Sequence, residues 1–251
     1  MERCPSEASN TTLDELLSLQ LHKFEDEVRS IVDKASKEAS MGKVIDEIED
    51  TWRELYFDFD PHPSTQTPLM RINEELIETL EDNQLQLQNM LSSKYIAHFF
   101  KEVTDWQKKL GNADQVIGIW MDLQRTWSHL ESIFIGSDDI RKQLPEDSQR
   151  FEIIDKEFKK IANFISDKKQ IVAATNEDKI VDRMESLKSD LSVCEKALAE
   201  YLETKRLAFP RFYFISSADL LDILSNGNKP RVVASHLVKL FDSMAKLEFR
   251  N

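Results

Sequence analysis

Residues that interrupt helices are scarce in this sequence. Its 251 residues include five glycines and seven prolines. Because glycine and proline most often bend or end a helix, their scarcity predicts long, uninterrupted helices. A chain of this length can form one or two hydrophobic cores, or it can spread the same apolar residues along an elongated bundle.

Cysteines and long apolar runs are equally scarce. Cys4 and Cys194 are too few for a disulfide framework and fit a reducing compartment. The first residues, including Glu2, Arg3 and Glu7, are polar where a signal peptide needs an apolar segment. No later run approaches the roughly 20 apolar residues of a membrane span. The sequence therefore predicts a cytoplasmic protein with no membrane partner.

Positive charge is in short supply as well. The formal net charge of -13 argues against a nucleic-acid partner, because phosphate contacts need a basic surface. The segment from Tyr201 to Asn251 differs, since it carries eight Lys/Arg and five Asp/Glu, a balance of +3 against -16 for the first 200 residues. This asymmetry is typical of an ordinary solvated surface, and it also allows the C-terminal part to face an acidic neighbour.

The sequence has no motif of a catalytic, cofactor-binding or metal site. Gly42-Lys43 is not a phosphate-binding loop, because Lys37 stands where the first glycine of that motif belongs. The acidic residues show no spacing that separates an acid/base pair from solvated helix faces. Histidine pairs typical of zinc proteases or di-iron bundles do not occur. We expect surface or boundary positions for the five histidines, which are His22, His62, His98, His129 and His236.

The N-terminal third combines helical stripes with a predicted hairpin. Residues 1–12 are small and polar, and we expect them to be disordered. Two apolar stripes follow at helical spacing, and Gly42 between them is expected to interrupt or bend the helix. In residues 55–72, apolar and polar residues first alternate, a proline-rich turn follows, and a second extended segment comes after it. This pattern predicts a small β-hairpin, and Pro68 restricts its second strand to an edge of the sheet. The two stripes contain Leu17, Leu21, Phe24, Val28, Ile31, Ala35, Met41, Val44, Ile48, Trp52 and Leu55.

Aromatic residues mark the helices in the middle of the chain. Asn73 fits an N-cap, and the segment that contains Trp106 is expected to end at Gly111-Asn112. On the next helix an aromatic residue recurs every seven positions, which is typical of a core stripe, although part of it could dock on a partner surface. These residues are Trp120, Trp127 and Phe134.

Two more helices follow an expected connector at Gly136–Pro145. The first has an apolar stripe from Phe151 to Ile165, and the second is a long helix over about residues 177–208. Cys194 shares the stripe of the long helix and is predicted to be a small core residue, not a nucleophile. Such narrow stripes predict a mainly α fold: an elongated series of antiparallel helical bundles with a small β-hairpin and one short aromatic strand.

The aromatic strand is expected directly after the long helix. Pro210 ends that helix, and Phe212–Ile215 has the aromatic and β-branched composition of a short buried strand. Arg211 could pair with a carboxylate on a packed helix or contact another domain. Ser216 fits the N-cap of a following helix. The apolar side of that helix includes Leu220 and Leu221, and Asn226-Gly227 is predicted as its left-handed stop.

This block resembles a segment of dynein heavy chains. Phe209–Ser225 is similar to the FPRFYF-S-x-x-(D/E)-LL-(D/E)-IL sequence of the dynein linker, and the similarity extends from about Leu13 to Phe249. The amino-acid sequence of these segments is most similar to that of axonemal outer-arm heavy chains. The other matching strings are Thr79–Gln84, Trp106–Leu110, Ile119–Gly136, Leu144–Ser148, Cys194–Arg206, His236–Phe241 and Leu247–Phe249. The resulting motif or packing residues are Trp106, Trp120, Trp127, Phe134, Phe209, Pro210, Arg211, Phe212, Tyr213, Phe214, Leu220 and Leu221.

The resemblance implies a mechanical function. Residues 13–251, including a strand-helix block at 209–249, would be part of the linker, a helical lever that transmits changes in an AAA+ ring of the same heavy chain. The chain itself would hold no cofactor, whereas ATP and Mg would act in the parent protein. That parent would be a microtubule minus-end-directed motor of the ciliary or flagellar axoneme, with other dynein subunits and microtubules as partners.

Two other classes of protein share some of these features. A spectrin-like or tethering scaffold of the cytoskeleton would have the same acidic charge and helical stripes, but a pure bundle has no use for the aromatic strand. A carboxylate-based hydrolase would require an acid/base pair, and the spacing of the acidic residues does not distinguish such a pair from solvated helix faces.

Overall fold

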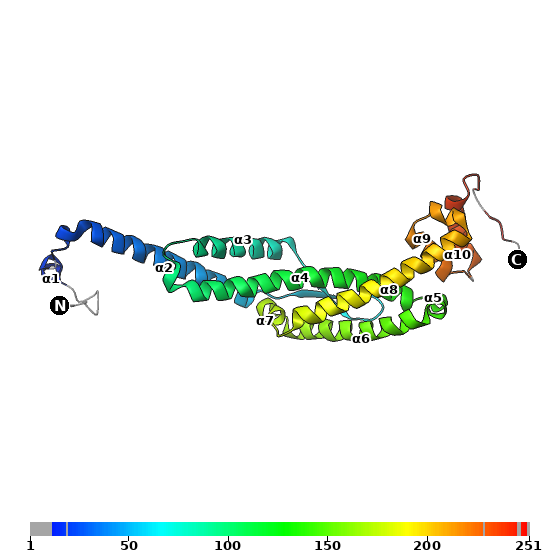
Figure 1. Cartoon of the computed structure of the whole chain (residues 1–251), viewed down its shortest axis with the longest axis horizontal. Coiled ribbons are helices and arrows are strands. Elements are labelled where there is room, and N and C mark those ends of the chain that lie inside the picture. Colours follow the sequence, from blue (N-terminus) through cyan, green and yellow to red (C-terminus); the bar gives the residue numbers. More distant parts are fainter. Residues whose placement is uncertain (1–11, 19, 228, 245–246, 250–251) are drawn as a thin grey trace. The chain divides into compact units, whose positions relative to one another are not determined.

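The computed structural model describes residues 12–18, 20–227, 229–244 and 247–249 (Figure 1). The segment predicted to be disordered, residues 1–12, lies outside this range except for Thr12. The fold is mainly helical with one two-stranded antiparallel sheet, which confirms the predicted fold class and its hairpin. The chain divides into two compact units: unit 1 contains Met1–Glu54 and Ile77–Leu110, and unit 2 contains Leu55–Leu76 and Gly111–Asn251. The elongated arrangement of bundles stays a prediction.

Unit 1 is built around one long helix. α1 (Leu13–Ser18) and η2 (Leu21–Phe24) are short, and α2 runs from Glu25 to Glu54. The predicted first stripe therefore spans three elements, and its residues Leu17 and Ile31 are exposed. The unit also includes most of α3 (Glu74–Leu91), η3 (Ile96–His98) and the first part of α4 (Phe100–Phe134). Its buried residues include Ile45, Ile48, Trp52, Leu80, Leu87, Val103, Trp106 and Leu110.

Gly42 does not interrupt the helix. α2 continues through this residue, and the glycine instead lets an aromatic ring approach the helix. A Cβ atom at position 42 would lie 3.3 Å from Cζ of Phe99, closer than most such contacts. Farther along α2, the indole N–H of Trp52 donates to Oδ1 of Asn83 at 3.0 Å, so the buried tryptophan keeps its hydrogen bond.

The predicted helix end at Gly111-Asn112 is also wrong. α4 continues from Phe100 to Phe134 because apolar residues recur in helical phase on both sides of the glycine, including Leu110 and Ala113. A single interior glycine costs only about 1 kcal/mol relative to alanine, which this burial outweighs. By contrast, the Asn73 cap is present, since Oδ1 of Asn73 accepts from the backbone N–H of Leu76 at 2.8 Å.

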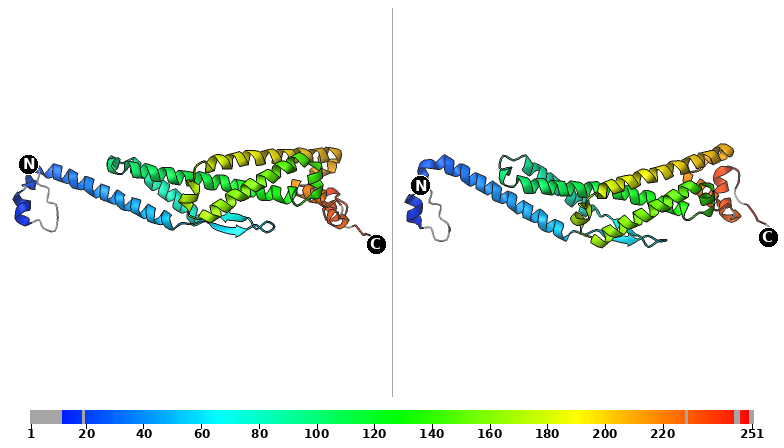
Figure 2. Two further views of the ribbon diagram at one scale, coloured as in Figure 1. Left: turned by 90° about the horizontal axis from the view of Figure 1, so that it is seen from below. Right: turned by 60° about the horizontal axis from the view of Figure 1, so that its bottom comes forward.

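Unit 2 joins the hairpin to a set of packed helices. β1 (Asp58–Pro61) and β2 (Pro68–Arg71) pair with Pro61 opposite Pro68, at the end of the ladder where neither proline's missing N–H interrupts it. β2 lies against α6 (Pro145–Lys168), and α6 lies side by side with α8 (Ile180–Ala208) (Figures 1 and 2). The remaining elements are α5 (Asp138–Gln143), α7 (Ile171–Thr175), η4 (Pro210–Phe214), α9 (Ser217–Ser225) and α10 (Pro230–Leu240).

The predicted aromatic stripe forms the core of unit 2. The ring of Phe158 on α6 stacks on Trp120 and Trp127 of α4, with centroid distances of 4.8 and 4.2 Å and interplanar angles of 6° and 12°. Phe134 stacks on Phe151 at 5.4 Å. All five rings are buried, so the core interpretation of Trp120, Trp127 and Phe134 agrees with the structure.

Polar groups around this core are paired. The indole N–H of Trp127 donates to Oδ1 of Asp155 at 3.1 Å, and Nζ of Lys159 donates to the other oxygen of that carboxylate at 2.7 Å. Gln124 of α4 acts as a partner for β2, because its side-chain amide accepts from the N–H of Met70 at 2.7 Å and donates to the Met70 carbonyl at 3.0 Å. The hairpin is thereby fixed to the same helix that supplies the tryptophans.

The structure corrects two predictions about short connections in unit 2. The connector expected at Gly136–Pro145 contains α5, which begins because Oγ of Ser137 accepts from the N–H of Ile140. Asn226 ends α9 at φ -114°, and no described glycine has positive φ, so the left-handed stop at Asn226-Gly227 is wrong. The Asn226 amide instead donates to the Asp222 carbonyl at 3.0 Å and thereby satisfies a helix end.

The strand predicted at Phe212–Ile215 is likewise wrong. Pro210 starts a tight 3₁₀ turn, in which the Phe212 N–H donates to the Phe209 carbonyl at 2.9 Å. Its fixed φ suits the first position of such a turn. Among these residues only Ile215 is extended and buried, with φ -114° and ψ 156°.

The stacked core should dominate the stability of unit 2. We expect Phe158→Ala to lower the free energy of unfolding by about 3–5 kcal/mol, because it removes a ring stacked on two tryptophans. The matched control is Phe214→Ala, whose ring is 73% exposed, with an expected change within about 0.5 kcal/mol. Urea unfolding followed by tryptophan fluorescence measures both, and equal effects would contradict the assignment of the core.

Candidate functional site at the end of the long helix

The candidate site lies where α8 gives way to η4, α9 and α10. α8 ends at Ala208, which is also where the predicted long helix ends. Phe209 is extended, with φ -136° and ψ 91°, and its N–H still donates to the Lys205 carbonyl at 3.0 Å. The five residues of η4 then turn the chain into α9. A long helix thus meets two short helices through a very short connection.

Arg211 fastens this turn to the end of α10. Its Nη1 donates to the carbonyl of Leu240 at 3.0 Å, and its guanidinium lies 4.6 Å from the ring centroid of Phe241. Among the described residues no carboxylate forms an ion pair with Arg211, so the predicted pairing is not found there. Leu240 is the last residue of α10, and the carbonyls of a last helical turn lack partners within the helix. A cation at this end also complements the helix dipole.

Charged side chains join α9 to α10. Oγ of Ser216 accepts from the N–H of Asp219 at 3.1 Å, which confirms Ser216 as the N-cap of α9. Nζ of Lys239 donates to Oδ1 of Asp219 at 2.8 Å. His236 contacts both acids, with its Nε2 2.6 Å from Oδ2 of Asp222 and its Nδ1 3.3 Å from Oδ1 of Asp219. The hydrogen bond from Lys239, followed by that from Ser216, lowers the pKa of the Asp219 carboxyl.

The aromatic residues of this block divide between surface and interior. Phe209, Tyr213 and Phe214 are exposed, whereas Leu220 and Leu221 are buried residues of α9. Phe212 is half-buried and meets Phe209 edge-on, with ring centroids 4.9 Å apart. The hydroxyl of Tyr213 donates to Oε1 of Glu203 at 2.5 Å, and this hydrogen bond raises the pKa of the tyrosine. The exposed rings form a surface on the turn, and the leucines anchor it.

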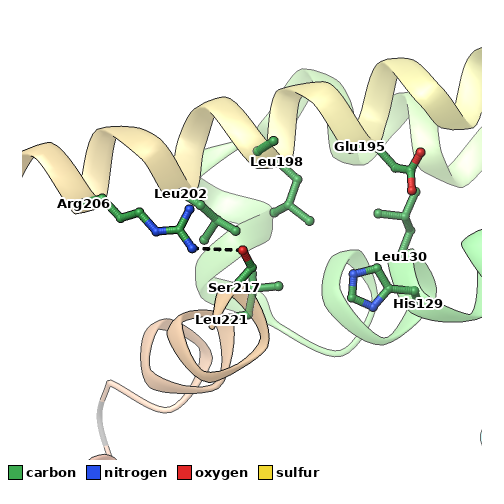
Figure 3. Close-up of a pocket in the computed structure, with 9 residues that line it drawn as sticks. His129, Leu130, Glu195, Leu198, Leu202, Arg206, Ser217 and Leu221 are labelled. Carbon is green, nitrogen blue, oxygen red and sulfur yellow. Dashed lines mark hydrogen bonds between the residues drawn. The ribbon is translucent and has the colours of Figure 1, made fainter. Parts of the chain in front are cut away.

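A pocket opens beside the turn, between α4, α8 and α9. Its volume is about 190 Å³. Figure 3 shows Arg206 and Ser217 at one end and His129 and Glu195 at the other. Nη2 of Arg206 donates to Oγ of Ser217 at 2.9 Å, which ties α8 to α9. The side chains between the two ends are apolar and belong to Leu130, Leu198, Ala199, Leu202 and Leu221.

The predicted site residues do not converge on one place. Trp106 lies in unit 1, where Nζ of Lys109 stands 4.4 Å from its ring centroid. Trp120, Trp127 and Phe134 belong to the stacked core of unit 2. The structure brings together the others at the end of α8, which are Phe209, Pro210, Arg211, Phe212, Tyr213, Phe214, Leu220 and Leu221.

Several contributing residues were not singled out from the sequence. Gln124 and Arg206 act through partners on other elements, and no local pattern identifies such partners. His236, which is expected at a surface or boundary position, is half-buried and bridges two acids. Cys194 is buried as predicted, and burial raises the pKa of its thiol to about 11, so the thiolate nucleophile is disfavoured.

The described part of the chain offers no group of three or more acidic, histidine or cysteine side chains placed to hold a metal ion. Within the same residues, the helices also lack the combination of length and hydrophobicity that crossing a bilayer requires. At the end of α8, hydrogen bonds of Arg206, Arg211 and Lys239 join α8, η4, α9 and α10.

The Asp219 contacts predict a pH effect. Its lowered pKa means that the ionised carboxyl favours the folded state above its usual titration range, and that this contribution is lost as the pH falls through the lowered pKa. We expect Lys239→Met to raise the pKa of Asp219, measured by NMR titration of the carboxyl carbon. Lys229→Met is the control, because Nζ of Lys229 donates to the amide oxygen of Asn226. An unchanged Asp219 pKa in K239M would contradict this role.

Comparison with known proteins places the chain in a family. Residues 1–251 match the family described as dynein heavy chain, N-terminal region 2. The ciliary dynein beta chain of Heliocidaris crassispina is 63% identical over 240 residues, and dynein axonemal heavy chain 17 of Mus musculus is 61% identical over 243 residues. The flagellar outer arm dynein alpha chain of Chlamydomonas reinhardtii is 46% identical over 235 residues.

These matches cover 94% to 97% of the chain but only 5% of each relative. The similarity is therefore to one small part of much longer heavy chains. Because the family match extends over the whole chain, the chain belongs to the dynein heavy chain family, as its N-terminal region 2.

Proposed function

We propose that this chain is a segment of the linker of an axonemal outer-arm dynein, and that it acts as a mechanical lever. The observation that carries the proposal is the family match over residues 1–251. The names of the relatives support the axonemal assignment, and two of them, from Chlamydomonas reinhardtii, are flagellar outer arm chains. In this role the chain transmits conformational changes of an AAA+ ring into the power stroke of ciliary or flagellar beating.

The packing within unit 2 supports a role in force transmission. A lever has to resist bending, and close-packed side chains in low-energy contacts resist deformation. α4 is 35 residues long, and its Trp120 and Trp127 stack on Phe158 of α6, which lies beside the 29-residue α8. Gln124 and Asp155 accept hydrogen bonds from the Met70 N–H and the Trp127 indole N–H, which adds directional restraints to this stack.

ATP hydrolysis takes place in the rest of the heavy chain. The ATPase sites, with ATP and Mg as their ligands, lie outside this segment. The AAA+ ring of the same heavy chain is its direct partner, and other dynein subunits and microtubules interact through the parent motor. The site of action is the axoneme of a cilium or flagellum.

The structure removes one objection to the spectrin-like scaffold. The aromatic strand that spoke against a spectrin-like bundle is a 3₁₀ turn, so it no longer separates the two classes. Membership of the dynein heavy chain family separates them instead. No contact among the described residues favours a hydrolase.

Three connections are candidate bending points in the lever. At Phe57–Thr67, Oγ of Ser64 donates to Oε1 of Glu131 at 3.1 Å. At Gly136–Pro145, Nη2 of Arg141 donates to the Ile135 carbonyl at 2.8 Å. At Phe209–Ser216, Nη1 of Arg211 donates to the Leu240 carbonyl of α10 at 3.0 Å. Each connection is short and fixed by a side chain, so an inserted residue should loosen it.

Glycine insertion in the full motor tests the proposal. We expect an insertion at the true bending point to reduce the velocity of microtubule gliding while leaving ATP turnover largely intact, because the insertion uncouples force from chemistry. A glycine inserted after Ser93, in the turn between α3 and η3, serves as the control. Unchanged gliding with insertions at all three connections would contradict the lever role.

A further inference from the structure

The pocket between α4, α8 and α9 has the size of a single side chain. Sites for drug-sized ligands and cofactors usually measure about 300–1,000 Å³, and this pocket has a volume of about 190 Å³. Four leucines supply its apolar wall, and all four are buried. A nucleotide would not fit, whereas an aliphatic side chain would. The leucines are Leu130, Leu198, Leu202 and Leu221.

Arg206 gives one end of the pocket an incompletely satisfied positive charge. Its Nε is buried and has no hydrogen-bond partner among the described residues. The nearest carboxylate contact is long, with Nη1 3.9 Å from Oε2 of Glu203, and Oε1 of Glu203 already accepts from the Tyr213 hydroxyl. A buried donor without a partner is destabilising, so an added acceptor at this end would be stabilising.

The opposite end of the pocket has the opposite charge. Glu195 stands there beside His129, across the leucines from Arg206 and Ser217 (Figure 3). A ligand carboxylate would be attracted to the Arg206 end and repelled from the Glu195 end. The pocket therefore distinguishes the two orientations of an amphipathic ligand as well as its charge.

We propose that this pocket binds a segment of a partner protein that inserts an aliphatic side chain next to an acidic residue. The aliphatic group contacts the leucines, and the carboxylate pairs with Arg206, whose planar guanidinium is suited to such pairing. The basic balance of the C-terminal part of the chain, +3 between Tyr201 and Asn251, complements an acidic partner. This assignment does not rest on the lever function, and either can fail alone.

NMR on the full chain with ¹³C-labelled leucine methyl groups tests the pocket. The probe is the blocked tetrapeptide acetyl-Gly-Leu-Glu-Gly-amide, and its glutamine counterpart differs only in the carboxylate. We expect saturable shifts of the Leu198, Leu202 and Leu221 methyl signals, with at least tenfold weaker binding of the glutamine peptide. Equal binding of the two peptides, or no shift at these leucines, would overturn the proposal. Binding of free 4-methylpentanoate without binding of the peptide would also overturn it.

Two variants locate the interaction. Arg206→Gln should abolish the preference for the glutamate peptide, whereas the matched Arg125→Gln, at an exposed arginine of α4, should retain it. Ala199 lines the pocket and is exposed, so Ala199→Trp should fill the pocket and prevent binding without disturbing the core. Ala97→Trp, at an exposed alanine of unit 1, is its control. Unchanged binding by both R206Q and A199W would overturn the proposal.

Discussion

The ring of Phe158 stacks on two tryptophans of α4, and much of unit 2 is arranged around this contact. Trp120 and Trp127 are seven residues apart on one helix face, so a single facing helix can meet both. The large rings are buried without leaving their polar atoms unpaired, because Gln124 and Asp155 accept from the indole N–H groups. Gln124 also binds both backbone groups of Met70, which couples the hairpin to the stack.

The structure at the end of α8 depends on a different constraint. Several helix ends lie close together in the sequence, and their backbone N–H and C=O groups need hydrogen-bond partners. Arg211 binds the last carbonyl of α10, Ser216 caps α9, and Asn226 returns to α9 through the Asp222 carbonyl. These contacts leave Phe214 and Tyr213 on the surface. Aromatic residues here therefore mark a surface next to a rigid corner, whereas the same residue types on α4 mark a core.

Periodic features were predictable from the sequence, and features that depend on distant partners were not. The heptad spacing of Trp120, Trp127 and Phe134 identified a buried face, and Asn73 and Ser216 identified helix starts, because both signals are local. The predicted helix end at Gly111-Asn112 failed because burial on either side outweighs the modest cost of one glycine in a helix, and Gly42 likewise lies inside a continuous helix.

The block at 209–216 shows the same limit. Its composition favours a strand, but a strand needs a neighbouring strand, and the described chain offers the Leu240 carbonyl and the Glu203 carboxylate instead. Likewise, the pocket at Arg206 depends on how α4, α8 and α9 converge, and no local pattern in any one of these helices indicates it. The family resemblance supplied what local patterns could not, because long matching strings are specific to one family.

Small-angle X-ray scattering on the purified chain tests the lever account most directly. A compact chain of 251 residues should have a radius of gyration of about 18 Å. We predict a value well above this, with a skewed distance distribution, because a lever has to extend its packed helices along one direction. A value close to that of a compact chain would contradict the account.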